Sequence, residues 1–104
     1  MRDKLTALGF TAFRVPLSGA WEKMGGDVRG RKGGRSYIFE HKSTRGTEQV
    51  TLKRLDIEKV REIAKREGSI GVLTLSFKGK HNIYAILDLE DLGKIIGDNV
   101  ATTR

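Results

Sequence analysis

Gly25-Gly26-Asp27-Val28 and, after a basic turn, Tyr37-Ile38-Phe39-Glu40-His41-Lys42 are the two stretches that decide the fold of this chain. We predict a β-hairpin whose first strand carries Asp27 and whose second carries Glu40 and Lys42. Because side chains two residues apart on a strand point to the same face, Glu40 and Lys42 are expected to project together. Two carboxylates and an amine in one place suit a divalent cation with oxygen ligands, Mg²⁺ or Mn²⁺. The lysine can then hold a water molecule or stabilise charge that develops on a phosphate.

The other face of the second strand follows from the same alternation. Ile38 is expected to share the face of Glu40, whereas Phe39 and His41 point the opposite way. His41 is therefore not expected to use its imidazole as a ligand beside Glu40.

A longer ordered pattern surrounds these residues. An R-x-P-x-S-G-A loop begins at Arg14, a G-D-V triplet contains Asp27, an apolar strand ends in Glu40-x-Lys42, and a helix is expected to begin near Gln49. The ordered set resembles the PD-(D/E)xK nuclease superfamily, and within it the archaeal and phage Holliday junction resolvases. The resemblance covers residues from about 9 to about 89.

The resemblance implies a metal-dependent endodeoxyribonuclease that cuts four-way (Holliday) junctions in DNA recombination and repair. It implies Asp27, Glu40 and the carbonyl of His41 as ligands of Mg²⁺, for which Mn²⁺ may substitute. Lys42 would complete the catalytic set. It also implies that Arg14 and Ser18 contact the DNA and that Gln49 supports the metal or the attacking water. A four-way junction has two symmetry-related strands to cut, so a homodimer is expected.

One part of the family pattern differs. The resolvases that this sequence resembles have a longer first helix, which carries an acidic metal ligand, and the corresponding turn is absent here. Asp3, Glu22 or a second subunit are the alternatives for that ligand.

Composition agrees with a nucleic-acid partner. The 104 residues fit one domain, 1–104, with a single core. Lysine and arginine number 20 against 13 acidic residues, and the net charge of +7 favours a polyanion. The chain has no cysteine, and we see no membrane span or signal peptide, so we expect a cytoplasmic protein of a prokaryote or of a phage or virus inside its host.

The order of elements predicts an α/β fold with a restriction-endonuclease-like core, in which a mixed five-stranded sheet is flanked by helices. The long helix should begin after an N-cap at Thr47, place Gln49 in its first turn and bury Leu52, Leu55, Val60 and Ile63 on one stripe. Helices are expected over residues 2–8, 49–67 and 89–96, and strands over 10–15, 27–29, 36–41, 69–77 and 83–87.

A glycine-rich basic turn joins the two strands of the hairpin. Its cations and the one just before it are candidate contacts to a DNA backbone, and a solvated charged loop is the competing interpretation. These residues are Arg29, Arg31, Lys32 and Arg35.

Two other functions remain open. One is a PD-(D/E)xK nuclease that acts on linear or nicked duplex, and the other is a non-catalytic DNA-binding module with the same fold.

Candidate surfaces for a dimer are residues 70–75, residues 83–87 and the C-terminal helix.

Overall fold

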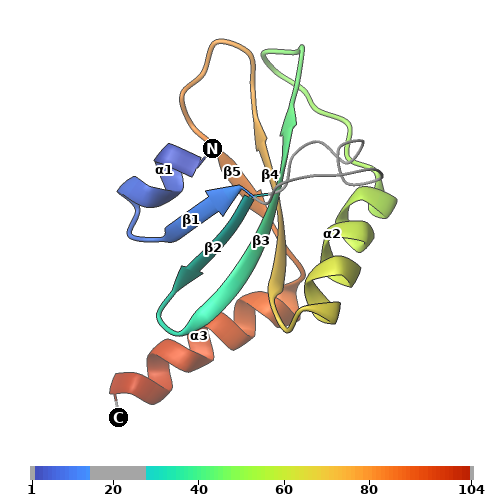
Figure 1. The fold of residues 1–104 in the computed structure, drawn as a ribbon. Coiled ribbons are helices and arrows are strands. Elements are labelled where there is room, and N and C mark those ends of the chain that lie inside the picture. The colour runs from blue at the N-terminus through green and yellow to red at the C-terminus, as the bar shows by residue number, and fades with distance from the viewer. Residues whose placement is uncertain (1, 15–27, 104) are drawn as a thin grey trace.

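Five strands form one mixed sheet in the order β1-β2-β3-β4-β5. The computed structural model of the chain describes residues 2–14 and 28–103. The elements follow the predicted order (Figure 1): α1 Arg2–Ala7, β1 Thr11–Arg14, β2 Val28–Lys32, β3 Arg35–Ser43, α2 Arg54–Arg66, β4 Ile70–Ser76, β5 Tyr84–Ile86 and α3 Leu89–Thr103. The mixed sheet with flanking helices confirms the predicted fold class.

The predicted hairpin is β2 and β3. The two strands are antiparallel, with Val28 opposite Phe39 and Lys32 opposite Arg35. Gly33 and Gly34 form the connection, with φ of 62° and 77°. Two consecutive residues with positive φ match the two-residue turn whose twist suits a hairpin, and glycine adopts that conformation without steric cost.

The centre of the sheet is the parallel pair β3 and β4, and α2 makes the crossover between them (Figure 1). α2 covers one face of the sheet, where its Val60 and Ala64 pack with Ile38 and Leu73. A parallel pair needs such a crossover, and the helix returns the chain to the end of the sheet at which β3 began.

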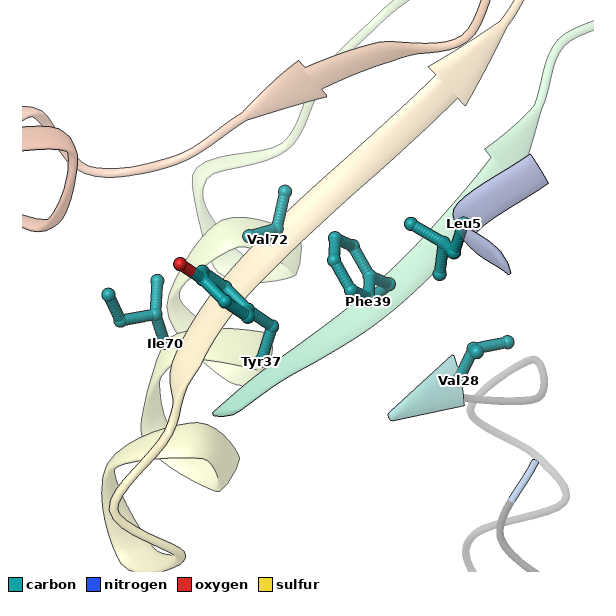
Figure 2. Packing of buried hydrophobic residues seen from close by; sticks show 6 residues of the cluster. All are labelled: Leu5, Val28, Tyr37, Phe39, Ile70 and Val72. Atoms are coloured by element: carbon teal, nitrogen blue, oxygen red, sulfur yellow. The ribbon is translucent and has the colours of Figure 1, made fainter. Parts of the chain in front are cut away.

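The opposite face carries the larger apolar cluster. The ring of Phe39 stacks against that of Tyr37, and Leu5 of α1 belongs to the same buried cluster (Figure 2). Ile95 of α3 packs against the same cluster, so α1 and α3 cover this face together. The buried members of the cluster are Leu5, Val28, Tyr37, Phe39, Ile70 and Val72. Ile38 and Phe39 thus take opposite faces, as the strand alternation predicts.

The long helix begins later than predicted. α2 begins at Arg54, with Lys53 at the N-cap position, so the predicted start near Gln49 and the predicted cap at Thr47 are wrong. The chain after β3 stays bonded to the end of β4: Thr44 N donates to the Ser76 carbonyl at 3.3 Å, and Lys78 N donates to the Gly46 carbonyl at 3.2 Å. The backbone therefore continues beside the sheet as far as Gly46, and α2 begins eight residues later.

The buried stripe of α2 shifts accordingly. Leu55 is 56% exposed and Leu52 precedes the helix, so their predicted burial is wrong, whereas Val60 is buried and Ile63 partly so. Ile57 and Ala64 complete the side of α2 that faces the sheet. The apolar period that starts at residue 57, and not the one that starts at residue 52, matches the core.

The last helix is longer than predicted. α3 continues to Thr103 instead of ending before Gly97, which does not adopt the left-handed conformation of a C-terminal cap. A glycine inside a helix costs only about 1 kcal/mol relative to alanine, so it does not by itself end one. In the part of the chain that the structure describes, no helix combines the length and the apolar character needed to cross a membrane.

Candidate active site

Glu40 and Lys42 lie on the α2 side of β3. Ile38, two residues before Glu40, is fully buried in the cluster that α2 covers. The Lys42 Nζ atom contacts Oδ2 of Asp56, in the first turn of α2, at 2.6 Å. Both observations put the two side chains on one face, as predicted, at the end of β3 where the chain leaves for α2.

The Lys42–Asp56 contact is a charge-assisted hydrogen bond between strand and helix. The donated hydrogen bond from Lys42 is the main reason that the pKa of Asp56 lies below its usual value, and partial burial opposes it. The positive charges of Lys42, Lys53 and Lys59 lower this pKa further. Asp56 is therefore an anion held against the amine of the candidate catalytic lysine.

His41 points to the other face. Its Nδ1 lies 2.9 Å from Oγ1 of Thr74, and its Nε2 lies 3.2 Å from Oγ of Ser76. Burial lowers the pKa of His41, which favours the neutral ring. The imidazole is thus occupied by β4 hydroxyls, away from Glu40, and only the backbone of His41 is available to the candidate site.

The direction of that backbone follows from a contact to β4. The carbonyl of Glu40 accepts a hydrogen bond from the Thr74 hydroxyl at 3.4 Å, so it points toward β4. Successive carbonyls along a strand point to opposite edges. The carbonyl of His41 therefore points toward the edge on which β2 lies.

The predicted loop residues Ser18 and Glu22, together with Asp27, lie outside the described residues, and of Arg14 only the backbone is described. The two ends of that segment are nevertheless placed. Arg14 is directly opposite Val28, and Val28 is directly opposite Phe39, the residue before Glu40. The chain thus leaves and re-enters the sheet beside the Glu40 end of β3.

The basic residues of the hairpin divide into two groups. The guanidinium of Arg29 binds both carboxylate oxygens of Glu67, with Nε to Oε1 at 2.8 Å. Lys32 donates a hydrogen bond to the carbonyl of Leu8, just after α1, at 2.7 Å. Its Nζ atom also lies 5.4 Å from the centre of the Phe10 ring. Arg31 is exposed and Arg35 partly so.

The two ion pairs that join α2 to the sheet should make folding sensitive to acid. The pKa of Asp56 and that of Glu67 are both lowered, chiefly by hydrogen bonds from Lys42 and Arg29. A carboxyl group whose pKa falls on folding stabilises the protein above its unfolded pKa, about 4, and this stability is lost as the pH falls through the folded value. Exposure limits each pair to about 0.2–1 kcal/mol.

We expect urea unfolding to report a lower free energy of unfolding at pH 3 than at pH 6. The Glu67→Gln variant should have a lower free energy of unfolding than the unaltered chain at pH 6. Its free energy of unfolding should also fall less between pH 6 and pH 3, because the carboxyl group that titrates has been removed. An equal fall in the free energy of unfolding in the variant and in the unaltered chain would show that the Arg29–Glu67 ion pair does not contribute to the acid sensitivity.

Gln49 does not occupy the first turn of the helix. It lies exposed in the segment between β3 and α2, because α2 begins at Arg54. Asp56 takes the first-turn position and reaches Lys42. Asp56 was not among the residues predicted from the sequence. The signal that could have found it is the apolar spacing of Ile57, Val60 and Ala64, which places the helix start near residue 54.

Among the described residues, the candidate metal ligands on this face of β3 are hard oxygen donors, because the imidazole of His41 points to the other face. Residues 2–14 and 28–103 contain no group of three or more histidine, cysteine, aspartate or glutamate side chains that could hold an ion. Asp3, one alternative for the missing acidic ligand, is exposed on α1. Asp27 and Glu22, which lie outside the described residues, and a second subunit are the other possible sources of acidic ligands.

Comparisons with known proteins bear on the fold and the family of the chain. A solved structure of Hjc from Archaeoglobus fulgidus, described as a Holliday junction resolvase from an archaeal hyperthermophile, is similar with a TM-score of 0.58 and 22% identity. The similarity covers 81% of this chain and 72% of that one, and it supports the fold. A search of curated proteins found no match. The model of the archaeal Holliday junction resolvase (Hjc) family matches residues 1–100, so the chain belongs to that family.

Proposed function

We propose that this resolvase-family nuclease is a Mg²⁺-dependent endonuclease that cuts four-way DNA junctions, with Asp27, Glu40 and Lys42 as its catalytic residues. One observation carries the proposal. Glu40 and Lys42 lie on the same face of β3, at the end of the sheet where Val28 re-enters beside Phe39. Asp27 is covalently joined to Val28, so its Cα lies about 3.8 Å from that of Val28.

The donor set fits a hard divalent ion. The carboxylates of Asp27 and Glu40 and the backbone carbonyl of His41 would hold it, and these oxygens suit Mg²⁺ or Mn²⁺ better than Zn²⁺. In its favour, the His41 carbonyl points toward the edge of β3 on which Val28, the residue after Asp27, lies. When bound, the ion would supply Lewis-acid activation of the phosphate and of water.

Side chains of the protein would supply the other catalytic and DNA-positioning functions. Lys42 would orient the attacking water or neutralise charge on the phosphate, while Arg14 and Ser18 would position the DNA strand. Water attacks phosphorus and the bond to the 3′ oxygen breaks, which leaves a 5′-phosphate and a 3′-hydroxyl. Such chemistry depends on positioning and electrostatic stabilisation more than on covalent steps.

The basic hairpin would contact a different phosphate from the one that is cut. Arg35 precedes Glu40 by five positions on one strand, a separation of about 17 Å. Arg31, near the hairpin turn and exposed, is the strongest candidate of the four for a backbone contact. Arg29 and Lys32 already bind Glu67 and Leu8, so their contribution to DNA affinity should be smaller.

We also propose a homodimer that acts on DNA in the cytoplasm of a prokaryote or of a phage-infected host. Among the candidate surfaces, strand β4 is excluded because its apolar side chains are buried in the core. The other two candidate surfaces, β5 and α3, both carry exposed apolar side chains. Tyr84 is 50% exposed, Leu89 80% and Ile96 52%, and Leu92 is 37% exposed. Leu89, Leu92 and Ile96 recur at the spacing of one helical face.

Cleavage of a labelled immobile junction tests the proposal against both alternatives. We expect symmetric paired nicks with Mg²⁺, none with EDTA and none in a linear duplex of the same arm sequence, by a species that sediments as a dimer. Cutting of both substrates would support a nuclease that acts on linear or nicked duplex. Binding without cleavage under any divalent ion would support a non-catalytic module.

A further inference from the structure

We infer that Asp56 is the positioning residue of Lys42, and that it holds the amine where a phosphate or water can meet it. This inference rests on the proposed function, because it assigns a partner within the same site. The contact is direct: Nζ of Lys42 lies 2.6 Å from Oδ2 of Asp56, and the two residues come from β3 and α2.

The carboxylate is held by a helix that is itself fixed at several points. Gly71 of β4 lets the backbone of α2 approach so closely that an added Cβ would lie 2.5 Å from the Val60 carbonyl oxygen. Val60 and Ala64 are buried against the sheet, and Glu67 at the far end of α2 binds Arg29 of β2. The position of Asp56 is therefore held by the packing of α2 against the face of the sheet that carries Glu40.

Lysine needs such a partner more than the other candidate residues do. Its side chain has four rotatable bonds and a compact ammonium group, so it does not hold one position unaided. The ammonium has three N–H donors, and Asp56 Oδ2 takes one of them. No other described residue accepts a hydrogen bond from Lys42, so two donors are left for a phosphate oxygen and a water molecule, and the contact with Asp56 does not have to break for Lys42 to act.

A different role for the same contact would be a resting-state latch, in which Asp56 competes with the phosphate for Lys42. The two roles predict opposite effects. Removing a latch would speed cleavage, whereas removing a positioning partner would slow it without weakening the binding of DNA. The free donors of Lys42 favour positioning.

The test compares Asp56→Asn and Asp56→Glu with the unaltered chain on the labelled junction with Mg²⁺. We expect Asp56→Asn to lower the single-turnover cleavage rate about 100-fold, with the Kd for the junction unchanged. Asp56→Glu keeps the charge and the first-turn carboxylate, so it should recover about tenfold of that loss. Should Asp56→Asn fail to fold, as judged by circular dichroism, Asp56→Ser, which is smaller and also uncharged, takes its place.

The matched control is Asp91→Asn. Asp91 is also a largely buried carboxylate that binds a cation of α2, Nε of Arg61 at 3.1 Å, but it touches none of the candidate catalytic residues. Its loss should lower stability and leave cleavage unchanged. Cleavage by Asp56→Asn at or above the rate of the unaltered chain, or an equal loss in Asp91→Asn, would overturn the inference. Absence of cleavage by the unaltered chain would instead overturn the proposed function and this inference with it.

Discussion

Glu40→Gln should abolish junction cleavage while leaving junction binding intact. Glutamine keeps the size and shape of glutamate and the packing of β3, but it removes the negative charge that would hold a divalent ion. Loss of one preorganised electrostatic group commonly costs about 10²–10³-fold in rate, and loss of the ion with it should cost at least that. Single-turnover cleavage and a gel-shift titration on the same junction measure the two effects separately.

Two further variants make this result specific. Asp27→Asn should behave like Glu40→Gln, because the two carboxylates are proposed to hold the same ion. Glu62→Gln removes an exposed carboxylate of α2 that binds Arg66 at 2.7 Å, and it should cleave at the normal rate. Normal turnover by either Asp27→Asn or Glu40→Gln would refute the assignment of the catalytic set.

Gly71→Ala should strongly destabilise the fold, because the added methyl group would meet other atoms more closely than at any other described glycine. The new Cβ would lie 2.5 Å from the Val60 oxygen, 2.7 Å from the Val60 carbonyl carbon and 2.9 Å from the Arg61 Cα. All three are backbone atoms of α2, so no side chain can rotate away and the whole helix has to shift. Overpacking of this kind costs about 1–3 kcal/mol, and we expect a value at the upper end.

Gly93→Ala is the matched control, since the same methyl group meets nothing within 4 Å on α3. Alanine is the better helix former, so this variant should gain about 0.5–1 kcal/mol. Urea unfolding of both variants gives the comparison. Equal free energies of unfolding for Gly71→Ala and Gly93→Ala would mean that the backbone of α2 does not pack closely against Gly71. A folded Gly71→Ala should also cleave more slowly, because α2 carries Asp56 to Lys42.

Local patterns predicted the central part of the fold well. The alternation along residues 36–41 separated Ile38 from Phe39, and the two clusters on opposite faces of the sheet confirm that separation. The glycines of the basic turn predicted a hairpin, and Gly33 and Gly34 form it. These features depend on neighbours in the chain and on the two-residue period of a strand, so the sequence carries them directly.

The starts and ends of helices were harder to predict, because distant contacts decide them. The backbone of Thr44 and Gly46 is bonded to the end of β4 and α2 begins only at Arg54, but no residue near Gln49 indicates this in the sequence. Gly97 was expected to end α3, but a glycine ends a helix only when the chain turns there, and here the helix continues to Thr103.

The sequence by itself therefore determined the α/β class, the hairpin and the common face of Glu40 and Lys42, because each follows from spacing along one strand or one turn. Only the tertiary structure decided that Asp56 meets Lys42, and that Asp56, not Gln49, lies in the first turn of α2. That pairing joins residues from two elements, and it depends on where α2 begins and on how closely Gly71 lets the helix approach the sheet. Both are properties of the packed fold, in which contacts between distant residues override local preference.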